Sequence, residues 1–109
     1  MLVKSKVNFP QTPFKLISLT NGLKCKVDPD RFPDLDRVHW RAVKSFSKIY
    51  ACHAYRQAGK IKVIRMHRLV AGTPPGQVCH HINGDTLDNR RINLRNMTLF
   101  DHTKMHSYR

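Results

Sequence analysis

The segment Thr73-Pro74-Pro75-Gly76 constrains the fold of this chain more than any other feature. Proline lacks a backbone N–H, and the residue before a proline is pushed out of the helical region, so neither a helix nor a strand continues through this segment. Just upstream, residues 66–71 are predicted to form a helical turn that ends at Gly72. The sequence therefore predicts a loop here and a boundary between two halves of the chain.

The half before this loop consists of short apolar stretches separated by turns, which is typical of β-strands. Residues 14–27 are predicted to form a hairpin that turns at Asn21-Gly22, because this dipeptide adopts positive φ at little cost. Asp28-Pro29-Asp30 favours the start of a short helix. Three further strands are expected, over residues 40–43, 48–55 and 60–65. Together these segments predict a small antiparallel sheet of three to five strands, after an extended arm of about a dozen residues.

The half after the loop has a different order of elements. A strand is expected over residues 77–80, a long polar loop over 82–93, a return strand over 94–98 and a terminal helix over 99–107. The fold class predicted for the whole chain is therefore α+β. Alternating apolar residues predict a small core for this half, made of Leu69, Val70, Ile82, Leu87, Ile92, Leu94, Met97 and Phe100.

The charge of the chain restricts the kind of partner. Lysine and arginine total 20 against 7 acidic residues, a formal charge of +13, so a polyanion is the expected partner. Nucleic acid is favoured over a membrane, because no apolar run approaches the roughly 20 residues that a spanning helix needs. The N-terminus lacks a secretory signal, which favours a cytoplasmic location. Cys25, Cys52 and Cys79 are an odd number at irregular spacing and are expected to be reduced core residues.

Histidines cluster at the end of the chain, where His80, His81, His102 and His106 lie within the last 30 positions. A strand, a loop, a return strand and a helix bring the first strand and the helix together, so His80 and His102 are expected to meet and to hold a divalent ion. Neighbouring residues on a strand point to opposite faces, so His81 is expected to have another role. A neutral imidazole there suits a general base that activates water for phosphodiester hydrolysis.

The stretch HRLVAGTPPGQVCHHINGDTLDNRRINLRNMTLFDH, from His67 to His102, resembles the HNH endonucleases (His-Me finger, ββα-metal type) of phages and mobile introns. The resemblance implies that His80 and His102 are metal ligands, that His81 is the general base and that Asn93 braces the loop as part of the catalytic group. It also implies 3′-hydroxyl and 5′-phosphate products, double-stranded DNA as the partner and no small-molecule cofactor.

A weaker resemblance extends upstream, where LISLTNGLKCKVDPDRFPDL, Trp40 and Tyr50-Ala51 are similar to the strand-rich part that precedes the finger in many phage members. The expected organisation is a DNA-gripping β-rich region over 1–65 and an HNH ββα-metal finger over 66–109, packed as one compact unit. A phage-encoded protein acting in the cytoplasm of a bacterial host is the expected source.

Two positions depart from the family's usual pattern, which commonly has Asp where His80 stands and Asn where His102 stands. The expected ion is Mg²⁺ or Mn²⁺. Zn²⁺ and Ni²⁺ are alternatives, because a pair of nitrogen ligands tolerates softer ions better than oxygen ligands do. His106 lies one helical turn beyond His102 and is a candidate third ligand. His67 is expected to be structural.

Arginines surround the motif and are candidates for binding phosphate, with a solvated surface as the alternative for each: Arg68, Arg90, Arg91 and Arg95. Basic residues of the β-rich half are expected to line one face against DNA, again with a solvated face as the alternative: Lys24, Lys26, Arg41, Lys44, Lys48, Arg56, Lys60 and Lys62.

Two other function classes stay open. One is a non-catalytic DNA-binding protein in which His80, His102 and His106 hold a structural zinc, and the other is an RNA-binding protein of ribosomal character. The sequence leaves open whether one or both DNA strands are cut, the target sequence, the oligomeric state and the biological role, whether homing, packaging or degradation of host DNA.

Overall fold

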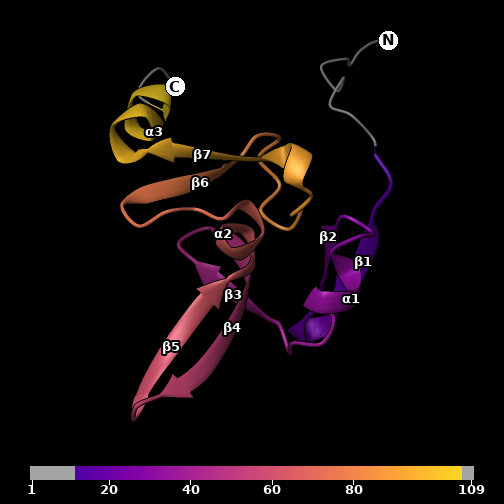
Figure 1. The fold of residues 1–109 in the computed structure, drawn as a ribbon. Coiled ribbons are helices and arrows are strands. Elements are labelled where there is room, and N and C mark those ends of the chain that lie inside the picture. The colour runs from indigo at the N-terminus through magenta and orange to yellow at the C-terminus, as the bar shows by residue number, and fades with distance from the viewer. Residues whose placement is uncertain (1–11, 107–109) are drawn as a thin grey trace.

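A computed structural model describes the backbone of residues 12–106 and the side chains of residues 12–103. It consists of three small antiparallel sheets and a few short helices, so the predicted α+β class is confirmed (Figure 1). The extended arm predicted for the first dozen residues lies almost entirely outside the described residues. The side chain of His106, the candidate third ligand, also lies outside them.

The first sheet is the hairpin that the sequence predicts. Strands β1 (Lys15–Ser18) and β2 (Lys24–Val27) pair in antiparallel register. Between them the short 3-10 helix η2 (Thr20–Gly22) contains Asn21 and Gly22 at φ values of 60° and 74°, the positive values for which this dipeptide is suited. Helix α1 (Phe32–Leu35) follows and buries Leu35, whose carbonyl oxygen accepts a 2.8 Å hydrogen bond from the Trp40 indole.

The second sheet contains β3 (Arg41–Ser45), β4 (Lys48–Gln57) and β5 (Lys60–Arg65) in that order. This antiparallel sheet has three strands, the lower end of the predicted range of three to five, because the β1–β2 hairpin does not join it. The reason lies in β2, whose Lys26 exchanges backbone hydrogen bonds with Leu87 and Asn89 of a distant loop. The β4–β5 hairpin extends away from the rest of the molecule (Figure 1).

Helix α2 (Met66–Ala71) joins the two halves of the molecule. It ends at Gly72, whose φ of 61° gives the left-handed cap that the sequence predicts. The helix contacts β4 and β5 on one side and the C-terminal strands on the other. Partly buried Leu87 and Leu94, from the half after the loop, pack against the buried core. That core lies in the half before the loop and consists of Ile17, Leu19, Cys25, Val27, Leu35, Trp40, Ala51, Met66 and Val70.

The third sheet pairs β6 (Gln77–His81) with β7 (Leu94–Thr98), and helix α3 (Leu99–His106) follows and contacts both strands. Between the strands a long loop ends in the 3-10 helix η3 (Arg91–Asn93). The order of strand, loop, strand and helix is therefore the predicted one.

The core predicted for the C-terminal half is only partly correct. Val70 and Met97 are buried and Leu87 and Leu94 partly so, whereas four other members are exposed: Leu69, Ile82, Ile92 and Phe100. Ile82 and Ile92 lie in the loop and in η3, where the alternation rule for strands does not apply. Leu69 and Phe100 lie on short helices with a face toward solvent.

The three cysteines are free thiols, as predicted. Cys25 and Cys52 are buried and Cys79 is half-buried. Burial raises the pKa of Cys25 to about 12, which makes this thiol inert. None of the helices in the described part of the chain has the length and apolar character needed to cross a lipid bilayer.

Candidate active site

A cavity of about 200 Å³ is lined by the end of β6. Three segments that are distant in the sequence line it: the start of β4, strand β6 with the loop after it, and helix α3. The lining residues are Lys48, Tyr50, Cys79, His80, His81, Gly84, Thr86 and His102.

His80 and His102 meet at this cavity. Their ring centroids lie 5.6 Å apart and the rings stand edge to face, and both side chains are half-buried. Two imidazoles that share one tetrahedral ion, with metal–nitrogen distances of 2.0–2.1 Å, have ring centres roughly 5 Å apart. The donor set and the spacing therefore fit a divalent ion, and the strand and the helix hold the two rings together as the sequence predicts.

His81 points to the other face of β6 and is held differently. Its Nε2 atom lies 2.8 Å from Oδ1 of Asn89, and the Nδ2 atom of the same amide lies 3.3 Å from the Met66 sulfur. With the amide in this orientation, Asn89 accepts the hydrogen bond and Nε2 of His81 donates it. The lone pair of a neutral His81 is consequently on Nδ1. The ring is only 6% exposed, and it reaches solvent through the cavity that it lines.

The surroundings of His81 are aromatic. The ring centroid of His67 is 4.9 Å away and that of Tyr50 is 6.2 Å away. Burial lowers the pKa of His81, opposed by the Asn89 hydrogen bond and by the charges of Asp85 and Asp88. Burial also lowers the pKa of His67 to about 3, assisted by the neighbouring His81. Both imidazoles are therefore neutral near pH 7.

The loop between β6 and β7 is closed by Asn93, which is fully buried. Its Oδ1 accepts from the backbone N–H of Asn83 at 2.9 Å, and its Nδ2 donates to the backbone oxygen of Asp88 at 2.8 Å. The Asn93 backbone oxygen also accepts from the N–H of Ile82. Asn93 thus joins the two ends of the loop by hydrogen bonds, and it does not itself line the cavity. The same loop contains Asn89, which contacts His81.

The four candidate phosphate-binding arginines have different environments. Arg90 is 1% exposed and donates to Asp88 at 2.7 and 2.8 Å and to the Thr12 hydroxyl at 3.0 Å. Its guanidinium is enclosed by the protein, so Arg90 is structural rather than a phosphate contact. Arg91 is half exposed and pairs with Asp28 and Asp30.

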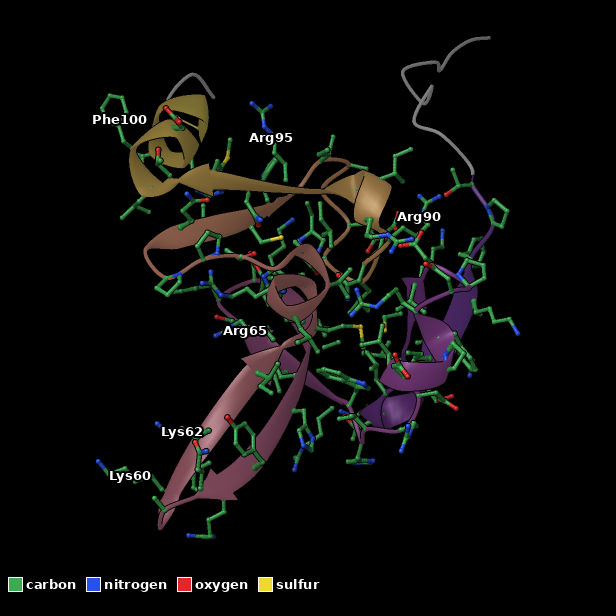
Figure 2. All side chains as sticks on the ribbon, in the orientation of Figure 1. Lys60, Lys62, Arg65, Arg90, Arg95 and Phe100 are labelled. Carbon is green, nitrogen blue, oxygen red and sulfur yellow. The ribbon has the colours of Figure 1, made fainter. Side chains whose placement is uncertain are left out.

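The other two arginines differ in a similar way. Arg68 donates to the backbone oxygens of Gln77 and Pro74 and so fixes the loop before β6. Arg95 is exposed and lies directly opposite His80 in the β6–β7 pairing, so the two side chains share one face. Figure 2 shows Arg95 directed away from β7, in contrast to the enclosed Arg90. Arg95 is the arginine best placed for a phosphate at His80.

The basic residues of the β-rich half do not line a single face. Lys60 and Lys62 lie on one side of the β4–β5 hairpin, and Arg56 on the other because it pairs with Ile61. Lys48 is the member of this group that reaches the cavity.

Sequence reasoning missed three residues of this site. Asn89 lies eight positions from His81, and this separation gives no sign of the hydrogen bond between them. Lys48, expected only among the basic residues that face DNA, and Tyr50, part of the weaker upstream resemblance, come from the other half of the chain. Neither was expected to lie beside the histidines. No group of three or more His, Cys, Asp or Glu side chains suited to a metal ion occurs among the described side chains, which do not include that of His106.

Comparison with known proteins adds no family assignment. No protein-family model matches the chain, and neither curated proteins nor solved structures include a significant match to it.

Proposed function

We propose that this protein is a metal-dependent DNA endonuclease of the HNH type, in which β6, β7 and α3 form a ββα-metal finger. One observation carries the proposal: a pair of imidazoles suited to a metal ion, His80 and His102, lines the same cavity as a third imidazole, His81, which a separate hydrogen bond orients. The metal ligand His80 and the base His81 are thus separate groups on opposite faces of one strand, and both line the same cavity.

His81 acts as the general base in this proposal. Its pKa is lowered by burial, so the ring is neutral at physiological pH, and Nδ1 accepts a proton from a water molecule in the cavity. The side-chain oxygen of Asn89 accepts a hydrogen bond from Nε2–H of His81. This hydrogen bond becomes stronger once the ring carries a positive charge. Asn93 keeps the loop, and hence Asn89, in place.

His80 and His102 are the residues that would hold the ion. A bound divalent cation supplies positive charge that stabilises the scissile phosphate and the leaving 3′ oxygen. The donor pair consists of nitrogen atoms alone, so we expect Mn²⁺, Zn²⁺ or Ni²⁺ to support activity as well as Mg²⁺.

The charge distribution supports double-stranded DNA as the substrate. The chain carries 20 basic and 7 acidic residues, and four of the acidic ones lie between positions 28 and 36, in and around α1. Lys48 lines the cavity and Arg95 lies opposite His80, where both favour a phosphate backbone over a neutral substrate. The family resemblance adds 3′-hydroxyl and 5′-phosphate products, and a phage-encoded protein in the bacterial cytoplasm.

The decisive assay follows conversion of supercoiled plasmid to nicked and linear forms with a panel of divalent ions. We expect wild type to cut only with an ion present, and His81→Ala to lose cleavage while its affinity for a fluorescent duplex stays within about threefold of wild type. His39→Ala is the matched control, because His39 is an exposed histidine outside the cavity. A pure, fully active His81→Ala protein would refute the assignment.

Chelation separates the proposal from a non-catalytic DNA-binding protein with a structural zinc. We expect chelator to stop cleavage while the far-ultraviolet circular dichroism spectrum is retained. Unfolding of the protein on removal of metal, with no cleavage under any ion, would favour the structural zinc instead.

A further inference from the structure

The turn between β3 and β4 contains an aromatic residue in a costly conformation. Ser45 pairs with Lys48, so Phe46 and Ser47 form a two-residue turn, and Phe46 has a φ of 57°. Positive φ is rare for a bulky residue, and turns that need it usually use Gly or Asn. The β1–β2 hairpin follows this rule with Asn21-Gly22. The β4–β5 turn places the small residue Ala58 at a φ of 52° before Gly59, so Phe46 is the bulky residue among the three.

The same residue also lacks a packing partner. The Phe46 side chain is 97% exposed, the highest value among the large apolar residues of the described chain. Fold stability gains nothing from a phenylalanine here, because the ring is not buried and the backbone is strained. Two unfavourable features at one position point to a role in binding rather than in folding.

The position of the turn connects Phe46 to the candidate active site. Lys48, two residues further along, lines the cavity with His81 and His102, and two residues span at most about 7 Å. Lys44 and Lys48 are both exposed and flank the ring in the segment Lys44-Ser45-Phe46-Ser47-Lys48. An exposed apolar ring between two cations therefore lies two residues from a side chain that lines the cavity.

We propose that Phe46 inserts partially between neighbouring base pairs of duplex DNA, within a few base steps of the phosphate in the cavity, while Lys44 and Lys48 contact the phosphates on either side. The inference rests on the proposed function, because it takes DNA to be the occupant of the cavity. The flanking lysines select a polyanion over an apolar protein surface. The faces of stacked bases are the apolar surface that duplex DNA offers to an aromatic ring, and phenylalanine is among the residues that other proteins insert there.

Partial insertion unwinds the helix, so the test measures plasmid topology rather than cleavage. Relaxed closed-circular plasmid is incubated with the full chain in chelator, then treated with a topoisomerase that needs no metal, and the topoisomers are separated on a gel. We expect wild type to shift the linking number in proportion to the protein bound. At equal occupancy, measured by fluorescence anisotropy, Phe46→Ala should lose at least about half of this shift.

Two comparisons make the result specific. Phe100→Ala removes another exposed phenylalanine, 73% exposed on α3, and should behave as wild type. Phe46→Leu keeps an apolar wedge and should retain part of the shift. The inference is overturned if wild type binds without a shift, if Phe46→Ala shifts the plasmid as wild type does, or if Phe100→Ala loses the shift instead.

The two proposals fail in different ways. A Phe46-dependent shift in a protein that never cleaves plasmid under any ion supports the wedge and refutes the nuclease. Cleavage by a protein that gives no shift supports the nuclease and refutes the wedge. Absence of DNA binding refutes both.

Discussion

His67 makes the stability of this protein sensitive to mild acid. The side chain is 7% exposed and its ring lies beside those of Tyr50 and His81, so the folded protein keeps it neutral, with a pKa lowered to about 3. The ordinary pKa of histidine is about 6.5. Between these two values the unfolded chain binds a proton that the folded protein does not, so stability falls as pH falls below about 6.5 and is complete above it.

The size of the effect follows from the two pKa values. Each pH unit within this window costs up to about 1.4 kcal/mol, and at pH 5 the accumulated loss from His67 is about 2 kcal/mol. His81 contributes in the same direction, because burial lowers its pKa as well. Burial of Asp88 is outweighed by the hydrogen bonds and charge of Arg90, which lower the pKa of Asp88. The stability that Asp88 contributes is therefore lost only near and below the ordinary pKa of a carboxyl, about 4. Measurements between pH 7.5 and 5 therefore isolate the histidines.

Urea unfolding in chelator, followed by circular dichroism at pH 7.5, 6 and 5, measures this dependence. His67→Phe and His67→Gln remove the titrating group, and we expect each to lose about 2 kcal/mol less than wild type between pH 7.5 and 5. His39→Ala, at an exposed histidine, should follow wild type. Equal pH dependence in wild type and both His67 variants would refute the reasoning.

Three further predictions address the loop, the surface and the turn. Arg90→Leu leaves Asp88 buried without its partner and should cost about 3–5 kcal/mol in urea unfolding; a loss under 1 kcal/mol would contradict the buried pair. Arg95→Ala should leave stability nearly unchanged but reduce the slope of log affinity for duplex DNA against log salt by about 0.9, and an unchanged slope would exclude a phosphate contact. Phe46→Gly relieves the positive φ and should stabilise the fold by about 1 kcal/mol; destabilisation would show that the turn is not strained.

Local signals predicted most of the secondary structure. Asn21-Gly22 marked the first hairpin, Gly72 ended α2, and the double proline separated the halves, because each of these residues restricts its own backbone. The pairing of His80 with His102 was also predictable, since strand, loop, strand and helix allow few arrangements.

Contacts between distant segments could not be predicted, because the local sequence restricts only its own backbone. The pairing of β2 with the Leu87–Asn89 region, which keeps the first hairpin apart from the three-stranded sheet, is one such contact. Arg90 was expected to bind phosphate or to lie on a solvated surface, but its guanidinium pairs with Asp88 and Thr12 inside the protein. Nothing in the local sequence of Lys48 or Asn89 indicates that β4 and the loop meet His81, because tertiary packing alone brings them together.

Anomalous diffraction from crystals grown with Mn²⁺ tests most directly whether the two histidines share an ion. The account predicts one strong peak within bonding distance of ring nitrogens of both His80 and His102, facing the cavity that His81 lines. Crystals soaked in saturating Mn²⁺ that show no peak between these two rings, or a peak held by other residues alone, would contradict it.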